Sequence, residues 1–116
     1  MNFESIGPYL LPAGFAAWLL LRHFRYRAAR RNMPKLEAEG AVFVDVRTPG
    51  EFAAGNRPGS LNIPLDAIAQ KAGTLDKDRP VVLSCASGAR SGIAAGILRS
   101  MGFKNVTNAG PWQNTL

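Results

Sequence analysis

The chain holds one cysteine, Cys85, and its neighbours make it a candidate nucleophile. The apolar stretch 80–84 comes directly before it and is typical of a buried strand. The small residues at 86–89 follow, and a helical pattern begins near Arg90. N–H groups of such a loop and the positive end of the helix dipole converge on the sulfur. These surroundings lower a thiol pKa and favour the reactive thiolate.

The loop after the cysteine also supplies groups that hold an anion. Gly88 permits the positive φ that a tight nest of N–H groups requires, and Arg90 offers a planar fork of donors. The only histidine, His23, lies far from this loop in the sequence, so no histidine base is expected at the site. A cysteine that ends a buried strand can also be an inert core residue, and that interpretation stays open. We predict Cys85 as the catalytic residue and, as substrate-binding residues, Ala86, Ser87, Gly88, Ala89, Arg90 and Ser91.

A second group of polar side chains ends the apolar stretch 41–47. It consists of Asp45 and Arg47, with Glu51 shortly after them. Sites in open parallel sheets form beyond the carboxyl ends of the strands, so we expect this group to lie near Cys85. We interpret Asp45 and Arg47 as a scaffold ion pair or capping set rather than as catalytic groups, and Glu51 as a capping residue. All three are predicted to support the site.

Alternating strands and helices must position these residues. We predict helices at 34–40, 51–54, 65–75 and 90–101, and strands at 41–47, 61–63, 81–84 and 106–107. Apolar strands that alternate with helices imply an α/β fold with a central, mostly parallel sheet and helices on both faces. The 116 residues are enough for one such domain.

The N-terminal part has a different composition. Residues 5–21 carry no charge, and five arginines follow within 22–31. A membrane-spanning helix needs about 17–25 apolar residues, so this run lies at the short limit, and it contains two prolines. Arginines that flank an apolar run mark the cytoplasmic side. We predict that residues 1–33 are a membrane anchor and basic arm, with a single transmembrane helix in the inner (plasma) membrane, and that domain 34–116 faces the cytoplasm.

Other interpretations of the run 5–21 stay open, namely a buried or interfacial helix and a cleaved signal. Residues 1–33 hold five arginines against one glutamate, a net charge of +4. Residues 34–116 hold nine basic against seven acidic residues, a net charge of +2. The basic character thus belongs to the arm, and we predict no nucleic-acid partner. A single cysteine excludes an intrachain disulfide and a multi-cysteine zinc site, and we expect neither a metal nor a cofactor.

The folded part, about residues 34–116, resembles the rhodanese-like domain family. The matching pieces occur in family order at 44–47 with 51–52, 55–64, 82–91 and 98–103. The resemblance implies that Cys85 is the active cysteine and that 86–90 cradle a persulfide. It implies a sulfurtransferase in which Cys85 takes sulfane sulfur from a small anionic donor, such as thiosulfate or a persulfide. A thiol or protein acceptor then receives the sulfur.

Loop length bears on the alternatives. Arg90 is five residues after Cys85, whereas cysteine phosphatases use a loop one residue longer to cradle a tetrahedral phosphate. The shorter loop favours a single sulfur atom, while a phosphatase or arsenate reductase stays an alternative. A non-catalytic binding or scaffold module at the membrane is a further alternative. Because the sequence stops soon after Trp112, we expect a short lid that leaves Cys85 open.

Overall fold

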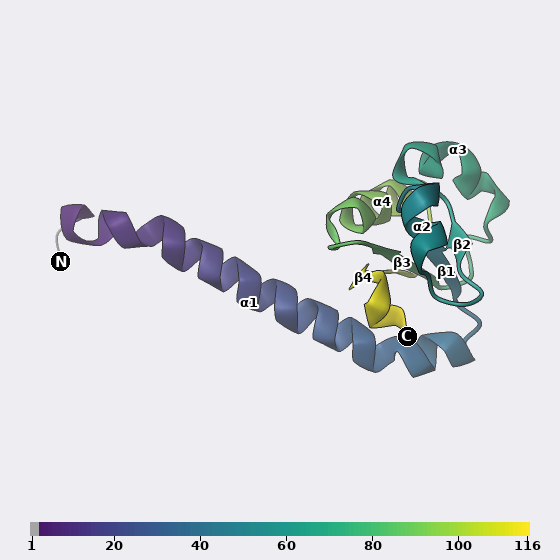
Figure 1. Cartoon of the computed structure of the whole chain (residues 1–116), viewed down its shortest axis with the longest axis horizontal. Helices are drawn as coiled ribbons and strands as arrows, with labels where there is room; N and C mark the ends of the chain where they lie inside the picture. Colours follow the sequence, from purple (N-terminus) through teal and green to yellow (C-terminus); the bar gives the residue numbers. More distant parts are fainter. Residues whose placement is uncertain (1–2) are drawn as a thin grey trace.

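The computed structural model describes residues 3–116. A long helix, α1 (Phe3–Ala38), passes along one side of an α/β body and projects beyond it (Figure 1). The short 3-10 helices are labelled η. In chain order the body contains β1 (Val42–Asp45), α2 (Pro49–Ala54), β2 (Leu61–Asn62), η1 (Leu65–Ala67), α3 (Ile68–Lys71), η2 (Ala72–Thr74), β3 (Val81–Cys85), α4 (Ala89–Ser100), β4 (Val106–Pro111) and η3 (Trp112–Thr115).

The described strands form one parallel sheet in the order β2-β1-β3-β4. Every residue of β3 is buried, because neighbouring strands flank it and helices cover both faces. A parallel strand that is buried on both faces needs a continuous apolar run, which the sequence supplies at 81–83. The predicted α/β fold with a parallel sheet is therefore confirmed.

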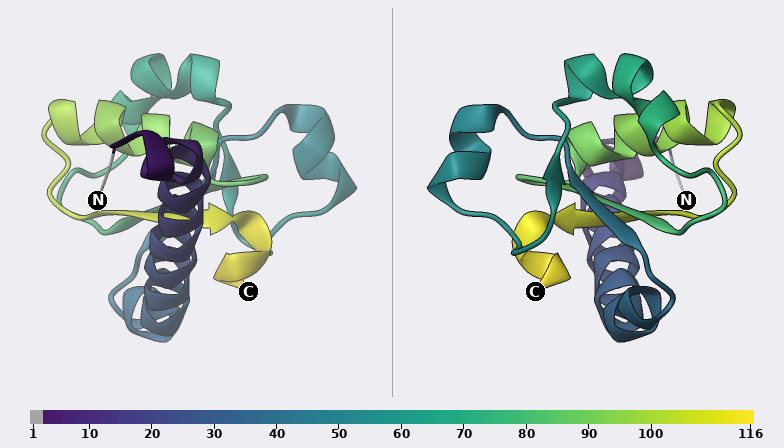
Figure 2. Two further views of the ribbon diagram at one scale, coloured as in Figure 1. Left: turned by 90° about the vertical axis from the view of Figure 1, so that its left-hand side faces the viewer. Right: turned by 90° about the vertical axis from the view of Figure 1, so that its right-hand side faces the viewer.

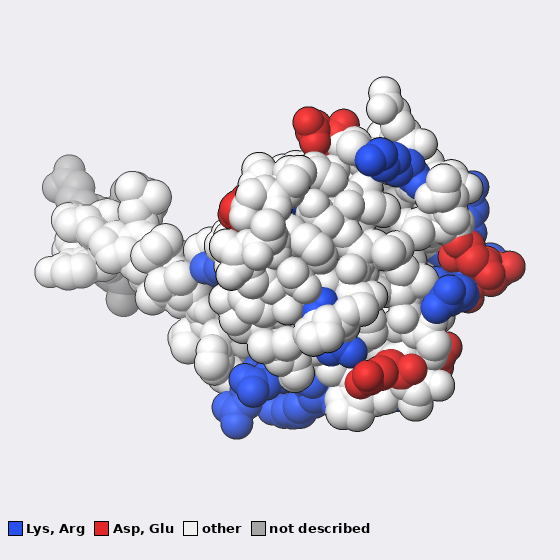
Figure 3. Space-filling view, turned by 45° about the vertical axis from the view of Figure 1, so that its right-hand side comes forward, with Lys and Arg blue, Asp and Glu red and all other residues white. Residues whose placement is uncertain are grey.

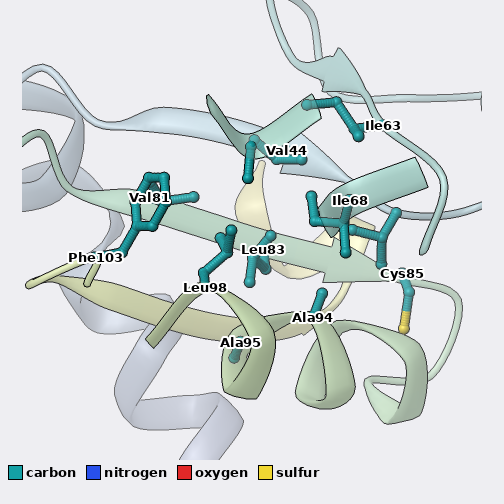
Figure 4. Packing of buried hydrophobic residues seen from close by; sticks show 12 residues of the cluster. Val44, Ile63, Ile68, Val81, Leu83, Cys85, Ala94, Ala95, Leu98 and Phe103 are labelled. Carbon is teal, nitrogen blue, oxygen red and sulfur yellow. The ribbon is translucent and has the colours of Figure 1, made fainter. Parts of the chain in front are cut away.

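Helices pack on the two faces of the sheet (Figure 2). On one face, Leu83 of β3 shares a buried cluster with Leu98 of α4 (Figure 4). On the other face, Val82 shares a cluster with Met33 and Leu36 of α1. Neighbouring strand residues point to opposite faces, so β3 contributes to both clusters. This packing fixes the carboxyl end of β3, where the cysteine lies.

The helix predicted at 34–40 is not a separate element but the last part of α1, which continues through Pro34. A proline inside a helix costs about 3 kcal/mol. Burial of Leu36 and its neighbours against the sheet offsets part of this cost. The helix gives way to a turn at Gly40, whose φ of 78° suits glycine. The helix predicted at 65–75 is instead broken into η1, α3 and η2.

The prediction of a membrane anchor at 5–21 is wrong. None of the helices within residues 3–116 combines the length and the apolar character that crossing a membrane requires. The uncharged run has only 17 residues between Glu4 and Arg22, the short limit for a span, and any longer stretch takes in a charge that lowers its mean hydropathy. Two prolines and two glycines within it lower the mean hydropathy further. The described helices give no support to the predicted transmembrane helix or membrane partner, and the predicted location in the inner membrane, facing the cytoplasm, is wrong.

The helix α1 nevertheless has two different parts. Beyond the body, Tyr9, Leu11, Phe15 and Trp18 are more than half exposed. In Figure 3 the described part of this projecting end is white, without charged side chains on the face in view. The later turns, with their arginines, pack on the body. The helix continues without a break across the predicted boundary between residues 1–33 and 34–116. The division of the chain into these two parts stays a prediction.

Candidate active site

Cys85 ends β3 at the carboxyl edge of the sheet, with its sulfur directed toward the start of α4 (Figure 4). The backbone N–H of Gly88 donates to Sγ at 2.9 Å, and Ser91 Oγ lies 3.3 Å from Sγ. The residue is 0 % exposed. The expectation of an open thiol is therefore wrong for this structure, because the surrounding groups enclose the sulfur completely.

The thiol pKa of Cys85 lies below its ordinary value. Burial raises this pKa, because burial disfavours a charged sulfur. The backbone N–H groups of Ser91, Gly88 and Ser87 donate to the sulfur, and the Ser91 hydroxyl, which donates to Asn108 here, can turn to an ionised sulfur 3.3 Å away. Together these groups lower the pKa by more than burial raises it. Gly88 has a φ of 102°, a conformation that strains other residues, and it brings its N–H onto the sulfur. The loop thus favours a thiolate without a histidine base.

Asn108 of β4 completes this network, and the sequence analysis missed it. Ser91 Oγ donates to Asn108 Oδ1 at 2.7 Å, and the backbone N–H of Gly110 donates to the same oxygen at 3.0 Å. Asn108 Nδ2 donates to the carbonyl of Gly88 at 3.2 Å. If Ser91 turns its proton toward the thiolate, Asn108 Oδ1 keeps the Gly110 donor and is not left unpaired. The available signal was a polar residue one position beyond the predicted last strand.

Arg90 points its fork at Glu51 of α2. Nη1 lies 2.7 Å from Oε1 and Nη2 lies 2.9 Å from Oε2. The hydrogen bond from Arg90, followed by one from the backbone N–H of Thr48, lowers the pKa of Glu51 to about 2. The same pair raises the pKa of Arg90. Glu51 also forms a capping box with Thr48 at the start of α2, so the expected capping role is present. The fork that we assigned to an anionic substrate is engaged by Glu51 here.

Asp45 and Arg47 form a buried ion pair under the site. Arg47 Nη2 lies 2.8 Å from Asp45 Oδ2, and Nε lies 3.0 Å from both carboxylate oxygens. The remaining donors of Arg47 reach the carbonyls of Glu51 at 3.2 Å and Gly55 at 2.6 Å. The guanidinium also lies 5.1 Å from the ring centroid of Trp112. The pair joins β1 to α2 and η3, which is the geometry of a scaffold ion pair.

The other predicted loop residues lie on its outer side. Ala86, Ser87 and Ala89 are exposed. A cavity of about 530 Å³ borders Ser87 and Ala89 and is closed on its far side by α1, with Arg22 and Tyr26 among its lining residues. A helix that we predicted to lie in a membrane therefore forms a wall next to the cysteine loop.

Comparison with known proteins points to one family. Residues 30–109 match the rhodanese-like domain. The chain is 36% identical over 81 residues to the thiosulfate sulfurtransferase PspE of Escherichia coli, an alignment that covers 68% of this chain and 76% of that protein. It is 40% identical over 72 residues to a sulfurtransferase of Allochromatium vinosum, covering 62% and 67% of the two chains. Among solved structures, a rhodanese with anions from Escherichia coli has a TM-score of 0.61 and 34% identity, and the match covers 64% of this chain and 89% of that one.

Proposed function

We propose that this chain, which belongs to the rhodanese-like domain family and is a rhodanese-type sulfurtransferase, carries the transferred sulfur as a persulfide on Cys85. The observation that carries the proposal is the set of donors around Sγ. The Gly88 N–H lies at 2.9 Å and the Ser91 hydroxyl at 3.3 Å. A thiolate and a persulfide are both anions, and both need such donors in a buried site.

The proposed reaction has two halves. In the first, the Cys85 thiolate attacks the outer sulfur of an anionic donor such as thiosulfate. The S–S bond of the donor breaks, sulfite leaves with the bonding electron pair, and Cys85 becomes a persulfide anion. In the second half, an acceptor thiolate attacks the outer sulfur of that persulfide. The new S–S bond breaks, the Cys85 thiolate is restored, and the acceptor leaves as a persulfide.

Both halves need access to a sulfur that has no exposed surface in this structure. The groups around Cys85 must move aside before a donor of the size of thiosulfate can touch Sγ. The loop 86–90 is exposed at several positions and lies between the buried sulfur and solvent, so movement of this loop is the simplest route. The wall formed by α1 lies on the outer side of the same loop.

We further propose that an anionic donor competes with Glu51 for the fork of Arg90. Arg90→Ala then raises the KM for thiosulfate about tenfold, which corresponds to about 1.4 kcal/mol. Arg90→Lys restores the KM only in part, because lysine lacks the planar fork. Glu51→Gln removes the competing carboxylate and lowers the KM. Steady-state kinetics separate KM from kcat, and a change in thermal midpoint with unaltered KM would show that Arg90 only braces α2.

The test of the proposed function is sulfur transfer from thiosulfate to cyanide by the full-length protein. Cys85→Ser keeps the size of the side chain and removes the sulfur, so we expect a folded protein without activity. Ala54→Ser, a matched change on the exposed side of α2, keeps full activity. Retained activity in Cys85→Ser would contradict the proposal. Wild-type protein that folds and binds a partner without any transfer would support a scaffold module instead.

A further inference from the structure

Arg22 of α1 contacts the outer side of the cysteine loop. Its Nη2 donates to the carbonyl oxygen of Ser87. The same guanidinium lies over the rings of Trp18 and Tyr26, at 5.6 Å and 5.5 Å from the two ring centroids. Arginine binds favourably over aromatic faces, so the two rings hold the long side chain in place next to the loop.

The carbonyl of Ser87 and the N–H of Gly88 belong to the same peptide group. That N–H donates to Cys85 Sγ at 2.9 Å. Because resonance couples the two ends of a peptide group, a cation at the oxygen draws electron density from the nitrogen and makes the N–H a stronger donor. Hydrogen bonds in such a chain strengthen one another in a low dielectric. A positive charge outside the loop thus acts on the sulfur inside it.

We propose that Arg22 is a positioning residue of this sulfurtransferase, which acts through the Ser87–Gly88 peptide to strengthen the hydrogen bond on the anionic sulfur of Cys85. The consequence for sulfur transfer rests on the proposed function, whereas the effect on the thiol does not. Arg22 lies outside residues 30–109, the segment that matches the family. The inference therefore gives α1 a part in the chemistry that family membership does not supply.

Tyr26 holds the same peptide in position. A Cβ added to Gly88 would lie 1.9 Å from Tyr26 Oη, and one added to Gly110 would lie 2.9 Å from the ring, so the phenol packs directly on both glycines. Asn114 Nδ2 donates to the carbonyls of Tyr26 and Ala109, each at 2.8 Å, and joins α1 to β4. These contacts keep Arg22 at a fixed distance from the loop.

Arg25 of α1 also lines the cavity beside the loop, and the other charged groups around Cys85 come from α2, β1 and α4. Arg90 pairs with Glu51, and Arg47 pairs with Asp45. Each of these cations is balanced by a carboxylate. Among the described residues, Arg22 belongs to none of the ion pairs, and its charge is directed at a backbone carbonyl. Its field at the loop is therefore not cancelled by an adjacent carboxylate.

The test is the pH profile of Cys85 alkylation by iodoacetamide in the full-length protein, followed by mass spectrometry. Arg22→Met removes the guanidinium and keeps an unbranched side chain. We expect the alkylation rate at a pH below the thiol pKa to fall about three- to tenfold, and the profile to move to higher pH. Arg22→Lys keeps a cation and restores the rate in part. Arg27→Met is the matched control, because Arg27 lies on the same helix and lines a different cavity, with His23. Its profile stays at the wild-type position.

A profile of Arg22→Met that coincides with wild type overturns the inference. An equal shift in Arg27→Met also overturns it, since any charge on α1 would then suffice. If Arg22→Met loosens α1, the chemical shift of the Gly88 amide proton gives the answer. A weaker hydrogen bond to the sulfur moves this resonance upfield. An unchanged resonance contradicts the proposed effect of Arg22 through the Ser87–Gly88 peptide. Alkylation needs no sulfur donor. A shifted profile in a protein that forms no persulfide therefore rejects the proposed function and supports this inference.

Discussion

Removal of the Ser91 hydroxyl tests how the buried thiol is ionised. Ser91 is buried, and its Oγ lies 3.3 Å from Cys85 Sγ and 2.7 Å from Asn108 Oδ1. Ser91→Ala removes one oxygen and leaves a methyl group in a site that α4 already fills. Asn108 Oδ1 retains the N–H of Gly110 as a donor at 3.0 Å. The substitution therefore removes the hydrogen bonds of Ser91 Oγ to Asn108 and to the sulfur, and only the bond to the sulfur acts directly on the ionisation of the thiol.

The size of the effect follows from that one bond. A hydrogen bond to a charged group contributes about 1.5–3 kcal/mol, and one pKa unit corresponds to about 1.36 kcal/mol. Sulfur accepts more weakly than oxygen, so the lower figure applies to the contact of 3.3 Å between Ser91 Oγ and Cys85 Sγ. The bond stabilises the thiolate more than the thiol. We expect Ser91→Ala to raise the thiol pKa by about one unit and to slow alkylation below both pKa values about tenfold.

The same substitution changes how stability depends on pH. The folded-state pKa of Cys85 lies below its ordinary value, so unfolding takes up a proton between the folded pKa and the unfolded pKa of about 8.5. The free energy of unfolding therefore rises with pH through this window, and the gain is lost as pH falls through the folded pKa. Ser91→Ala raises the folded-state pKa of Cys85, so the pH window between the folded and unfolded pKa values becomes narrower. The free energy of unfolding then rises less with pH. Ser100→Ala, an exposed serine on the same helix, serves as the control. An unshifted alkylation profile in folded Ser91→Ala would refute the reasoning.

Three further substitutions, with Gly59→Ala as a control for one of them, test the scaffold around the site. Asp45→Ala leaves Arg47 buried without its carboxylate and lowers the free energy of unfolding by about 3–5 kcal/mol in urea titrations, whereas a loss below about 1 kcal/mol would contradict a buried pair. Gly88→Ala places a Cβ against α1 at a φ of 102° and reduces both stability and activity. Gly59→Ala, at a φ of 81° with open space around it, carries only the conformational cost of about 1–2 kcal/mol and keeps activity. Leu98→Ala creates a cavity in the α4 face of the core and costs about 2–5 kcal/mol, and the alkylation profile of the thiol stays in place.

The parts of the site that local patterns determine could be predicted from the sequence. An apolar run at 81–83 marks a strand that is buried on both faces, and the cysteine two residues after it must then lie at the sheet edge. Gly88 marks a positive φ, which the structure has. Asp45 and Arg47 are two residues apart, so they share one side of an extended chain and can pair.

Contacts between distant segments could not be predicted in this way. Arg90 and Glu51 are 39 residues apart, and the sequence analysis gave each a separate local role. A guanidinium fork that suits an anionic substrate equally suits a carboxylate of the protein, and only the fold shows which of the two is near. Asn108 was missed because its role depends on a partner, Ser91, that another element supplies.

The interpretation of α1 failed for a related reason. Hydropathy averaged over 5–21 describes composition and contains no information on what the later turns of the helix contact. Arg22 was assigned to the boundary of a membrane, whereas the structure binds it to Ser87, 65 residues away in the sequence. The predicted helix 34–40 began at Pro34 because proline usually begins or interrupts a helix. In the structure α1 continues through Pro34, and packing on the sheet overrides that preference.

The most direct test of the central claim is the mass of the full-length protein after incubation with thiosulfate and removal of excess donor. The account predicts a gain of one sulfur atom, located by digestion on the peptide that contains Cys85, absent from Cys85→Ser, and lost again when a thiol acceptor is added. Absence of the added sulfur with thiosulfate, polysulfide and persulfide donors alike, in protein whose unfolding curve is intact, would contradict the account.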